Sequence, residues 1–175
     1  MHFTFDEIVN RENTDCLKWD YTAQRFGSRD IIPMWVADMD FKSPSTITKE
    51  IIKRAEHGIY GYTMPSDSLG DAICSWMLKR HSWEISKTRI IYSPGVVSSV
   101  NTAILALTNA GDKVLMQTPV YYPFYSSISD NGRQLVTNPL KYVNGIYEID
   151  FDVLEQNLSK NVRMMILCSP HNPIG

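Results

Sequence analysis

The sequence contains few of the residues that mark disulfide-bonded, metal-binding or membrane-spanning proteins. Its three cysteines, Cys16, Cys74 and Cys168, lie far apart and form no C-x-x-C pair, which predicts reduced thiols in a cytoplasmic protein. The four histidines show no metal-ligand spacing, so we expect surface or structural roles and no metal site. No apolar run approaches the roughly 18 residues of a transmembrane helix, and no signal-peptide pattern opens the chain. We therefore expect a soluble protein that does not bind membranes.

Charge of one sign and the common nucleotide motifs are also missing. The 17 basic and 19 acidic residues are interspersed and give a net charge of −2, so no basic stripe indicates a nucleic-acid partner. The sequence has no G-x-G-x-x-G, no G-x-x-x-x-G-K-[ST] and no G-x-S-x-G, which removes the main support for dinucleotide, P-loop and hydrolase sites. Its 175 residues, 43% of them hydrophobic, are enough for one domain with a core.

Apolar runs and amphipathic segments alternate through the second half of the chain. Strands are expected over residues 89–93, 113–118, 134–137 and 163–168, and helices over 96–107, 121–130 and 151–157. Asn144-Gly145 predicts a hairpin turn between two short runs. This alternation predicts an α/β fold with a mostly parallel sheet and helices on both faces.

The first part of the chain is more polar. We interpret residues 1–42 as an N-terminal arm with a substrate-loop segment, and 43–175 as the first part of a larger domain. Helices are expected at 5–9, near 15–18, from 43–44 to 57–58, and from about residue 66. Asp38 and Asp40 lie among Trp35, Met39 and Phe41; they are either exposed acids in a turn or structural caps of nearby backbone groups, and we favour the structural role.

The segment Ile90–Val100 indicates a strand, a turn at Gly95 and a helix whose free N–H groups at Val96 and Val97 could bind a phosphate. An ordinary strand–helix connection is the alternative. Tyr121 and Asn172 follow two other expected strands, and ligands in parallel sheets bind beyond such carboxyl ends. A planar phosphorylated cofactor would use all three features, and pyridoxal 5′-phosphate fits this description.

Several strings carry a family resemblance. Residues 34–41 (MWVADMDF), Gly61-Tyr62, 94–97 (PGVV), 111–114 (GDKV), 118–124 (TPVYYPF) and 171–175 (HNPIG) resemble, in order, the class I/II aminotransferase family. The first and fifth strings resemble its cystathionine β-lyase, or C–S lyase, branch. The resemblance implies the fold-type I architecture of pyridoxal-phosphate enzymes, with a homodimer and active sites shared between subunits.

The resemblance also implies roles for individual residues. The backbone at Gly95, Val96 and Val97 would bind the cofactor phosphate, the Tyr121 ring would stack on the cofactor, and Asn172 would contact its phenolic oxygen and the substrate carboxylate. The alternatives are a core aromatic residue for Tyr121 and an Asn-Pro turn for Asn172.

Two earlier positions are implied in the same way. Tyr62 would reach the phosphate bound in the neighbouring subunit, with Tyr60 as the substitute if the register differs, and either tyrosine could instead pack structurally. Ala37 lies in the family segment that passes over the substrate carboxylate.

No lysine of this chain matches the family's cofactor-binding lysine, which we expect beyond Gly175. The resemblance therefore implies the N-terminal part of a pyridoxal-phosphate C–S β-lyase, inactive by itself, that cleaves cystathionine or similar S-substituted cysteines to thiol, pyruvate and ammonia. An aminotransferase, or a non-catalytic fragment with a regulatory or partner-binding role, are the alternatives.

Overall fold

The computed structural model describes residues 5–175. The chain divides into two units, Met1–Pro65 and Ser66–Gly175. The first unit contains α1 (Leu17–Asp20), α2 (Thr22–Phe26) and α3 (Ser45–Glu56). The domain boundary expected between residues 42 and 43 stays a prediction.

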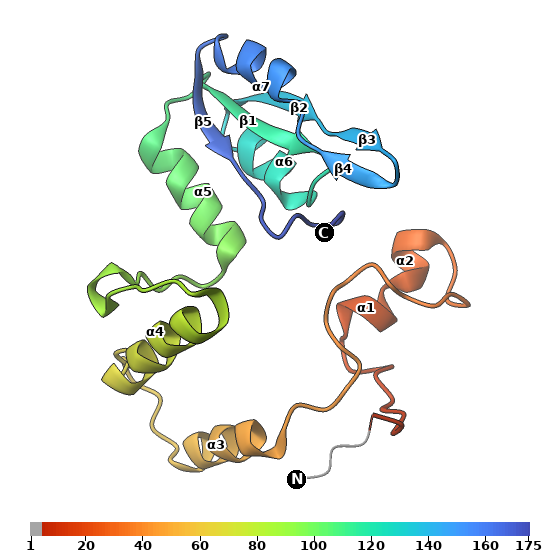
Figure 1. Ribbon diagram of the computed structural model, residues 1–175. Coiled ribbons are helices and arrows are strands. Elements are labelled where there is room, and N and C mark those ends of the chain that lie inside the picture. Colours follow the sequence, from red (N-terminus) through yellow and green to blue (C-terminus); the bar gives the residue numbers. More distant parts are fainter. Residues whose placement is uncertain (1–4) are drawn as a thin grey trace. The chain divides into compact units, whose positions relative to one another are not determined.

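The second unit has the expected alternation of helices and strands (Figure 1). Its elements are α4 (Asp67–His81), the 3₁₀ helix η1 (Lys87–Arg89), α5 (Val96–Leu107), β1 (Lys113–Thr118), α6 (Pro123–Ser129), β2 (Gln134–Pro139), β3 (Lys141–Val143), β4 (Ile146–Glu148), α7 (Phe151–Leu158) and β5 (Val162–Ile166). β1 is the middle strand of a sheet with the order β2-β1-β5, and it pairs in parallel with both neighbours. The predicted α/β fold with a parallel sheet is confirmed.

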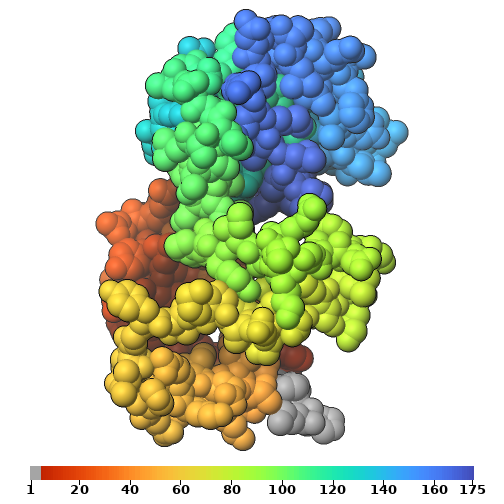
Figure 2. Space-filling view, turned by 90° about the vertical axis from the view of Figure 1, so that its left-hand side faces the viewer, coloured from red at the N-terminus to blue at the C-terminus, as the bar shows by residue number. Residues whose placement is uncertain are grey.

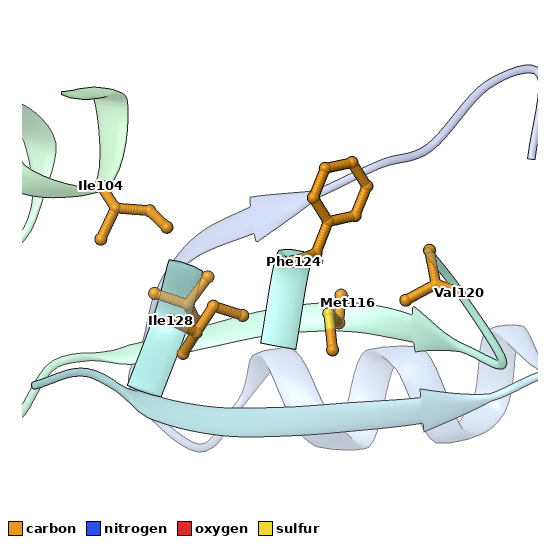
Figure 3. Close-up of a cluster of buried hydrophobic side chains, with 6 residues drawn as sticks. Ile104, Met116, Val120, Phe124 and Ile128 are labelled. Atoms are coloured by element: carbon orange, nitrogen blue, oxygen red, sulfur yellow. The ribbon is translucent and has the colours of Figure 1, made fainter. Parts of the chain in front are cut away.

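The core of the second unit forms where α5 and α6 cover one face of β1 (Figure 3). Alternate residues of a strand point to opposite faces, and Val114 and Met116 both point toward these helices. They pack with Ile104 of α5 and with Phe124 and Ile128 of α6, and each of these five side chains is at most 7% exposed. The sequence buries these residues together because each helix presents its apolar stripe to the sheet.

The opposite face of the sheet is covered by α7, which lies on the other side of the strands from α6 (Figure 3). The Asn157 side chain anchors this helix by donating from Nδ2 to the carbonyl oxygen of Thr137 in β2, at 3.0 Å. Helices therefore cover both faces of the sheet, as the alternating pattern predicted.

Two buried amide side chains lie side by side on the α7 face of the sheet. Gln117 in β1 and Asn138 in β2 are register partners, and they are 1% and 0% exposed. Among residues 5–175, their side-chain nitrogen and oxygen atoms have no hydrogen-bond partner. Because a buried amide without a partner costs free energy, these two positions are the least satisfied polar part of the described core.

The predicted hairpin turn at Asn144-Gly145 is confirmed. β3 and β4 pair antiparallel across these two residues, which both have positive φ, 51° for Asn144 and 86° for Gly145. Positive φ at both central positions is the requirement of the two-residue turn that Asn-Gly favours. Tyr142 and Tyr147 face each other across the strands with ring centroids 4.9 Å apart, and this pair stabilises the register.

Two expected elements are absent. Residues 89–93 form no strand: η1 occupies 87–89, and the segment that follows pairs with no strand of the described chain. Residues 5–9 form no helix either. Phe5 instead packs edge-on against Phe41 at 5.0 Å between ring centroids, and Glu7 pairs with Lys42. These tertiary contacts replace the weak helical preference of a five-residue segment.

The helix α4 begins as predicted after Ser66, whereas α3 begins at Ser45, one residue later than predicted, because Pro44 is its N-cap residue. Large apolar side chains of both helices are exposed. Ile47 and Ile51 of α3 are 52% and 65% exposed, beside a hollow of about 700 Å³ that runs along the helix. Figure 2 shows the residues of α3 at the surface of the first unit. Within the described residues, no helix is both long and apolar enough to cross a bilayer.

Asp150 at the start of α7 carries a pH-dependent contribution to stability. Its carboxylate accepts from Lys141 Nζ at 2.9 Å and from the Val153 N–H at 3.2 Å, and these two donors lower the pKa of Asp150. A lowered pKa adds stability that is present above the ordinary aspartate value of about 3.9 and is lost as the pH falls below it.

Replacing Asp150 with asparagine tests this contribution, because Asn keeps an N-cap acceptor but removes the charge. We expect the wild-type protein to have the higher urea midpoint at pH 7, and the difference from Asp150→Asn to shrink as the pH falls below about 4. If the difference in urea midpoint between the wild type and Asp150→Asn stayed constant from pH 7 to pH 2, this result would contradict the ion pair between Asp150 and Lys141.

Candidate cofactor site

The N-terminus of α5 offers backbone donors to an anion. Gly95 is the N-cap residue, no side chain of the described chain caps the helix, and its first turn contains no acid. Val96 is 73% exposed. A Cβ added to Gly95 would meet no atom within 4 Å, so the space beside the turn is open. A twelve-residue helix with uncapped N–H groups has the positive dipole end that binds phosphate.

Contacts along α5 determine which edge of the sheet this helix end approaches. Arg133, which directly precedes β2, donates from Nη2 to the Thr108 carbonyl oxygen at 2.6 Å, so the C-terminal end of α5 lies at the amino edge of the sheet. In the middle of the helix, Asn101 donates to Ser127 Oγ of α6 at 2.9 Å. Twelve helical residues span about 18 Å, and the six residues of β1 span about 20 Å. The Val96 end of α5 therefore lies at the carboxyl edge, where Figure 1 shows the start of α5 on the same side as the C-terminus.

Tyr121 follows β1 at this carboxyl edge. Its ring meets Phe124 edge-on, with centroids 5.7 Å apart, and Tyr122 at 5.5 Å in a tilted arrangement. The side chain is half-buried and packs against the core cluster. The ring is thus held in position by the core while part of it remains exposed, and this geometry suits both the stacking role and the packing role.

Asn172 lies in the turn after β5 and is exposed. Because β5 is the parallel neighbour of β1, the turns that follow the two strands lie at the same edge of the sheet. His171 joins them directly, since its Nε2 lies 2.8 Å from the Pro119 carbonyl oxygen. These two atoms form a hydrogen bond if Nε2 carries the proton. The structure therefore places the Asn172 and Tyr121 segments next to each other, and His171 has a structural role there.

Ala37 and Tyr62 belong to the first unit. Both are exposed, and the Tyr62 side chain has no part of its surface covered within that unit. Tyr60, the alternative to Tyr62, donates its hydroxyl to the Ala55 carbonyl oxygen at 2.6 Å. This bond ties Tyr60 to the end of α3 and leaves Tyr62 as the better candidate for a ligand contact.

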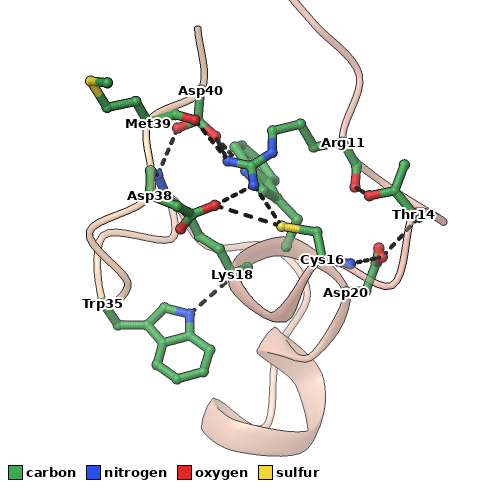
Figure 4. A network of polar contacts seen from close by, with 10 residues as sticks. Arg11, Thr14, Cys16, Lys18, Asp20, Trp35, Asp38, Met39 and Asp40 are labelled. Atoms are coloured by element: carbon green, nitrogen blue, oxygen red, sulfur yellow. Dashed lines mark hydrogen bonds and ion pairs between the residues drawn. The ribbon is translucent and has the colours of Figure 1, made fainter. Parts of the chain in front are cut away.

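Five side chains of the first unit form what we call the Arg11 cluster: Arg11, Lys18, Trp19, Asp38 and Asp40 (Figure 4). Asp40 accepts from Arg11 Nη1 at 2.6 Å, from Lys18 Nζ at 2.7 Å and from Trp19 Nε1 at 2.8 Å. Asp38 pairs with the other terminal nitrogen of Arg11. Lys18, Trp19 and Arg11 hold the pKa of Asp40 well below its usual range, and the two carboxylates raise the pKa of Arg11. Asp40 is therefore ionised at neutral pH.

Comparison with known proteins assigns the chain to a family. The family described as Aminotransferase class I and II matches residues 29–175. The chain belongs to this family. Over 172 residues it is 48% identical to cystathionine beta-lyase PatB of Bacillus subtilis (strain 168), a match that covers 98% of this chain and 44% of that protein.

Two solved structures have the same fold as this chain. Cystalysin from Treponema denticola, which contains pyridoxal 5′-phosphate, superimposes with a TM-score of 0.92 at 37% identity, covering 100% of this chain and 45% of that one. The PLP-bound C-S lyase from Staphylococcus hominis superimposes with a TM-score of 0.89 at 33% identity. This match covers 99% of this chain and 44% of that one. The chain thus spans somewhat under half the length of these relatives. The expected class I and II aminotransferase family is confirmed, and the relative that is 48% identical carries the name of the expected cystathionine β-lyase branch.

The structure brings some of the expected class I/II aminotransferase site residues together. Within the second unit, Gly95, Val96 and Val97, the Tyr121 segment and the Asn172 segment share the carboxyl edge of the sheet, and their individual roles remain predictions. Asp38 and Asp40 have the expected structural role, but their carboxylates accept from side chains rather than capping nearby backbone groups, and the sequence did not indicate Arg11 and Lys18 as the donors. No local pattern marks these partners, because 21 to 29 residues separate Lys18, Trp19 and Arg11 from the carboxylates that they contact.

Proposed function

We propose that the protein carrying this chain is a pyridoxal-phosphate-dependent C–S β-lyase that cleaves cystathionine or similar S-substituted cysteines to a thiol, pyruvate and ammonia. The similarity over 98% of this chain to a protein named cystathionine beta-lyase carries the proposal. The similarity to cystalysin and to a C-S lyase, both solved with the cofactor, supports it.

The residues at the carboxyl edge fit pyridoxal phosphate. The uncapped start of α5 has no acid to repel a phosphate, and the space beside Gly95 is open. In the proposed site the Val96 and Val97 N–H groups bind the phosphate, the Tyr121 ring lies against the cofactor ring, and the Asn172 amide donates to its phenolic oxygen. The bound cofactor would supply an electron sink for the bond-breaking steps.

Other residues of the proposed site orient the amino-acid substrate and complete the phosphate site. The backbone at Ala37, together with Asn172, binds the substrate carboxylate and so fixes which bond of the substrate faces the cofactor. Tyr62 reaches the phosphate bound in a second subunit, so the working form is a homodimer, and we propose a cytoplasmic location. The lysine that moves the substrate proton is proposed to lie outside residues 1–175.

An assay of the intact protein with cystathionine tests the function. We expect pyruvate, thiol and ammonia in equal amounts, and we expect residues 1–175 alone to form no product and no borohydride-stable adduct between pyridoxal phosphate and a lysine. Absence of both pyruvate and thiol would overturn the lyase assignment. Steady conversion of a 2-oxo acid to an amino acid, without thiol release, would replace it with the aminotransferase alternative.

A further inference from the structure

The Arg11 cluster holds the main chain of one short loop as well as two carboxylates (Figure 4). Lys18 Nζ donates to the Asp38 carbonyl oxygen at 3.0 Å, and Arg11 Nη1 donates to that of Met39 at 3.3 Å. On the other side of Ala37, Trp35 Nε1 donates to the Lys18 carbonyl oxygen at 3.2 Å. The loop is thus fixed on both sides of an exposed alanine.

The two cations are more covered than their acidic partners, because the Asp38 and Asp40 side chains are 38% and 41% exposed. The Lys18 side chain is 9% exposed and that of Arg11 is 21% exposed, whereas exposed pairs contribute little. The loop from 35 to 40 forms no helix or strand that would fix its backbone. Lys18 and Arg11 each contact both a carboxylate and a main-chain carbonyl oxygen of the loop, so the partly buried cluster favours one conformation of this loop.

The charges of the cluster also affect what the loop can bind. Asp38 is the residue next to Ala37, and an unpaired carboxylate there would repel an anionic ligand. Arg11 and Lys18 supply two positive charges against the two carboxylates. The same cations donate to the carbonyl oxygens of Asp38 and Met39, so these acceptors have partners within the cluster.

We propose that Arg11 and Lys18 are positioning residues, which hold the 35–40 loop and neutralise its acids so that the backbone at Ala37 can bind the substrate carboxylate. This inference rests on the proposed function, in which Ala37 contacts that carboxylate. It assigns control of substrate affinity to residues that do not themselves touch the substrate.

Two variants of Arg11 in the intact, cofactor-loaded protein test the inference. Arg11→Met removes charge and contacts, whereas Arg11→Lys keeps the charge but cannot reach both carboxylates at once. Lys53→Met is the control, because Lys53 is 79% exposed and pairs only loosely with Glu50 on α3. The measurements are kcat and KM for cystathionine, the Kd of glycine, cofactor content, and chymotryptic cleavage after Trp35 or Phe41. Glycine has the carboxylate but no leaving group.

For Arg11→Met we expect KM and the glycine Kd to rise about tenfold, which is the size of effect that follows the loss of a hydrogen bond to a charged group. We expect kcat and the cofactor content to stay close to the wild-type values. Loop cleavage should accelerate, and Arg11→Lys should give a smaller rise. Unchanged KM and glycine Kd in both Arg11 variants would overturn the inference, as would an equal effect of Lys53→Met. If the wild type releases no thiol but the Arg11 variants still weaken glycine binding, the lyase proposal fails and the positioning role stands.

Discussion

Replacing Val96 with proline is expected to weaken cofactor retention by the intact protein about tenfold to hundredfold. Val96 is the first residue of α5, a position where proline is favoured in helices because its fixed φ suits the first turn. Gly95 is extended, with φ 169° and ψ 164°, as the residue before proline prefers. The substitution therefore removes one N–H donor to the phosphate while the helix remains. A hydrogen bond to a charged group contributes about 1.5–3 kcal/mol, which corresponds to that loss of affinity.

Val96→Ala is the matched control, because alanine keeps the N–H and the valine side chain is 73% exposed. Equilibrium dialysis of pyridoxal phosphate against each variant measures the affinity, and circular dichroism verifies that the helix content is unchanged. Equal affinities for the proline and alanine variants would show that the start of α5 does not bind the phosphate.

Replacing Ile104 with alanine is expected to lower the free energy of unfolding by about 2–5 kcal/mol, the range for a large aliphatic residue truncated in a packed core. Ile104 is 0% exposed and joins α5 to the β1 and α6 residues of the core cluster. Its loss would leave a cavity at the contact that holds α5, and with it the proposed phosphate-binding turn, against the sheet. Urea denaturation of the intact protein measures the change.

Leu105→Ala is the control for this second variant. Leu105 is the next residue of the same helix but is 56% exposed, so its truncation should cost about 0.5 kcal/mol or less. A similar loss for both variants would mean that helix propensity or a contact outside the described core, rather than burial of Ile104, determines the effect.

The sequence predicted the elements whose periodicity is strong and whose partners are near. The α5 and β1 bounds match the expected ranges residue for residue, because each of these segments has a clear helical or continuous apolar pattern. The neighbouring positions of the Tyr121 and Asn172 segments also followed from sequence, since parallel strands bring their carboxyl ends to one edge.

The errors have physical causes that a local pattern does not contain. A strand needs hydrogen bonds to a neighbour, and Ile91, at the centre of the expected 89–93 strand, is 92% exposed in the second unit. The 5–9 segment is governed by contacts with Phe41 and Lys42. The Arg11 cluster could not be derived for the same reason, because only the folded chain brings Arg11 and Lys18 to Asp38 and Asp40.

The crystal structure of the intact protein grown with pyridoxal phosphate would test the central claim most directly, namely that the start of α5 and the turns after β1 and β5 form one cofactor site. We expect the phosphate oxygens to lie within hydrogen-bonding distance of the Val96 and Val97 N–H groups, with the pyridine ring over Tyr121. Electron density for the cofactor at any other place, with the α5 N-terminus bound only to water, would contradict the claim.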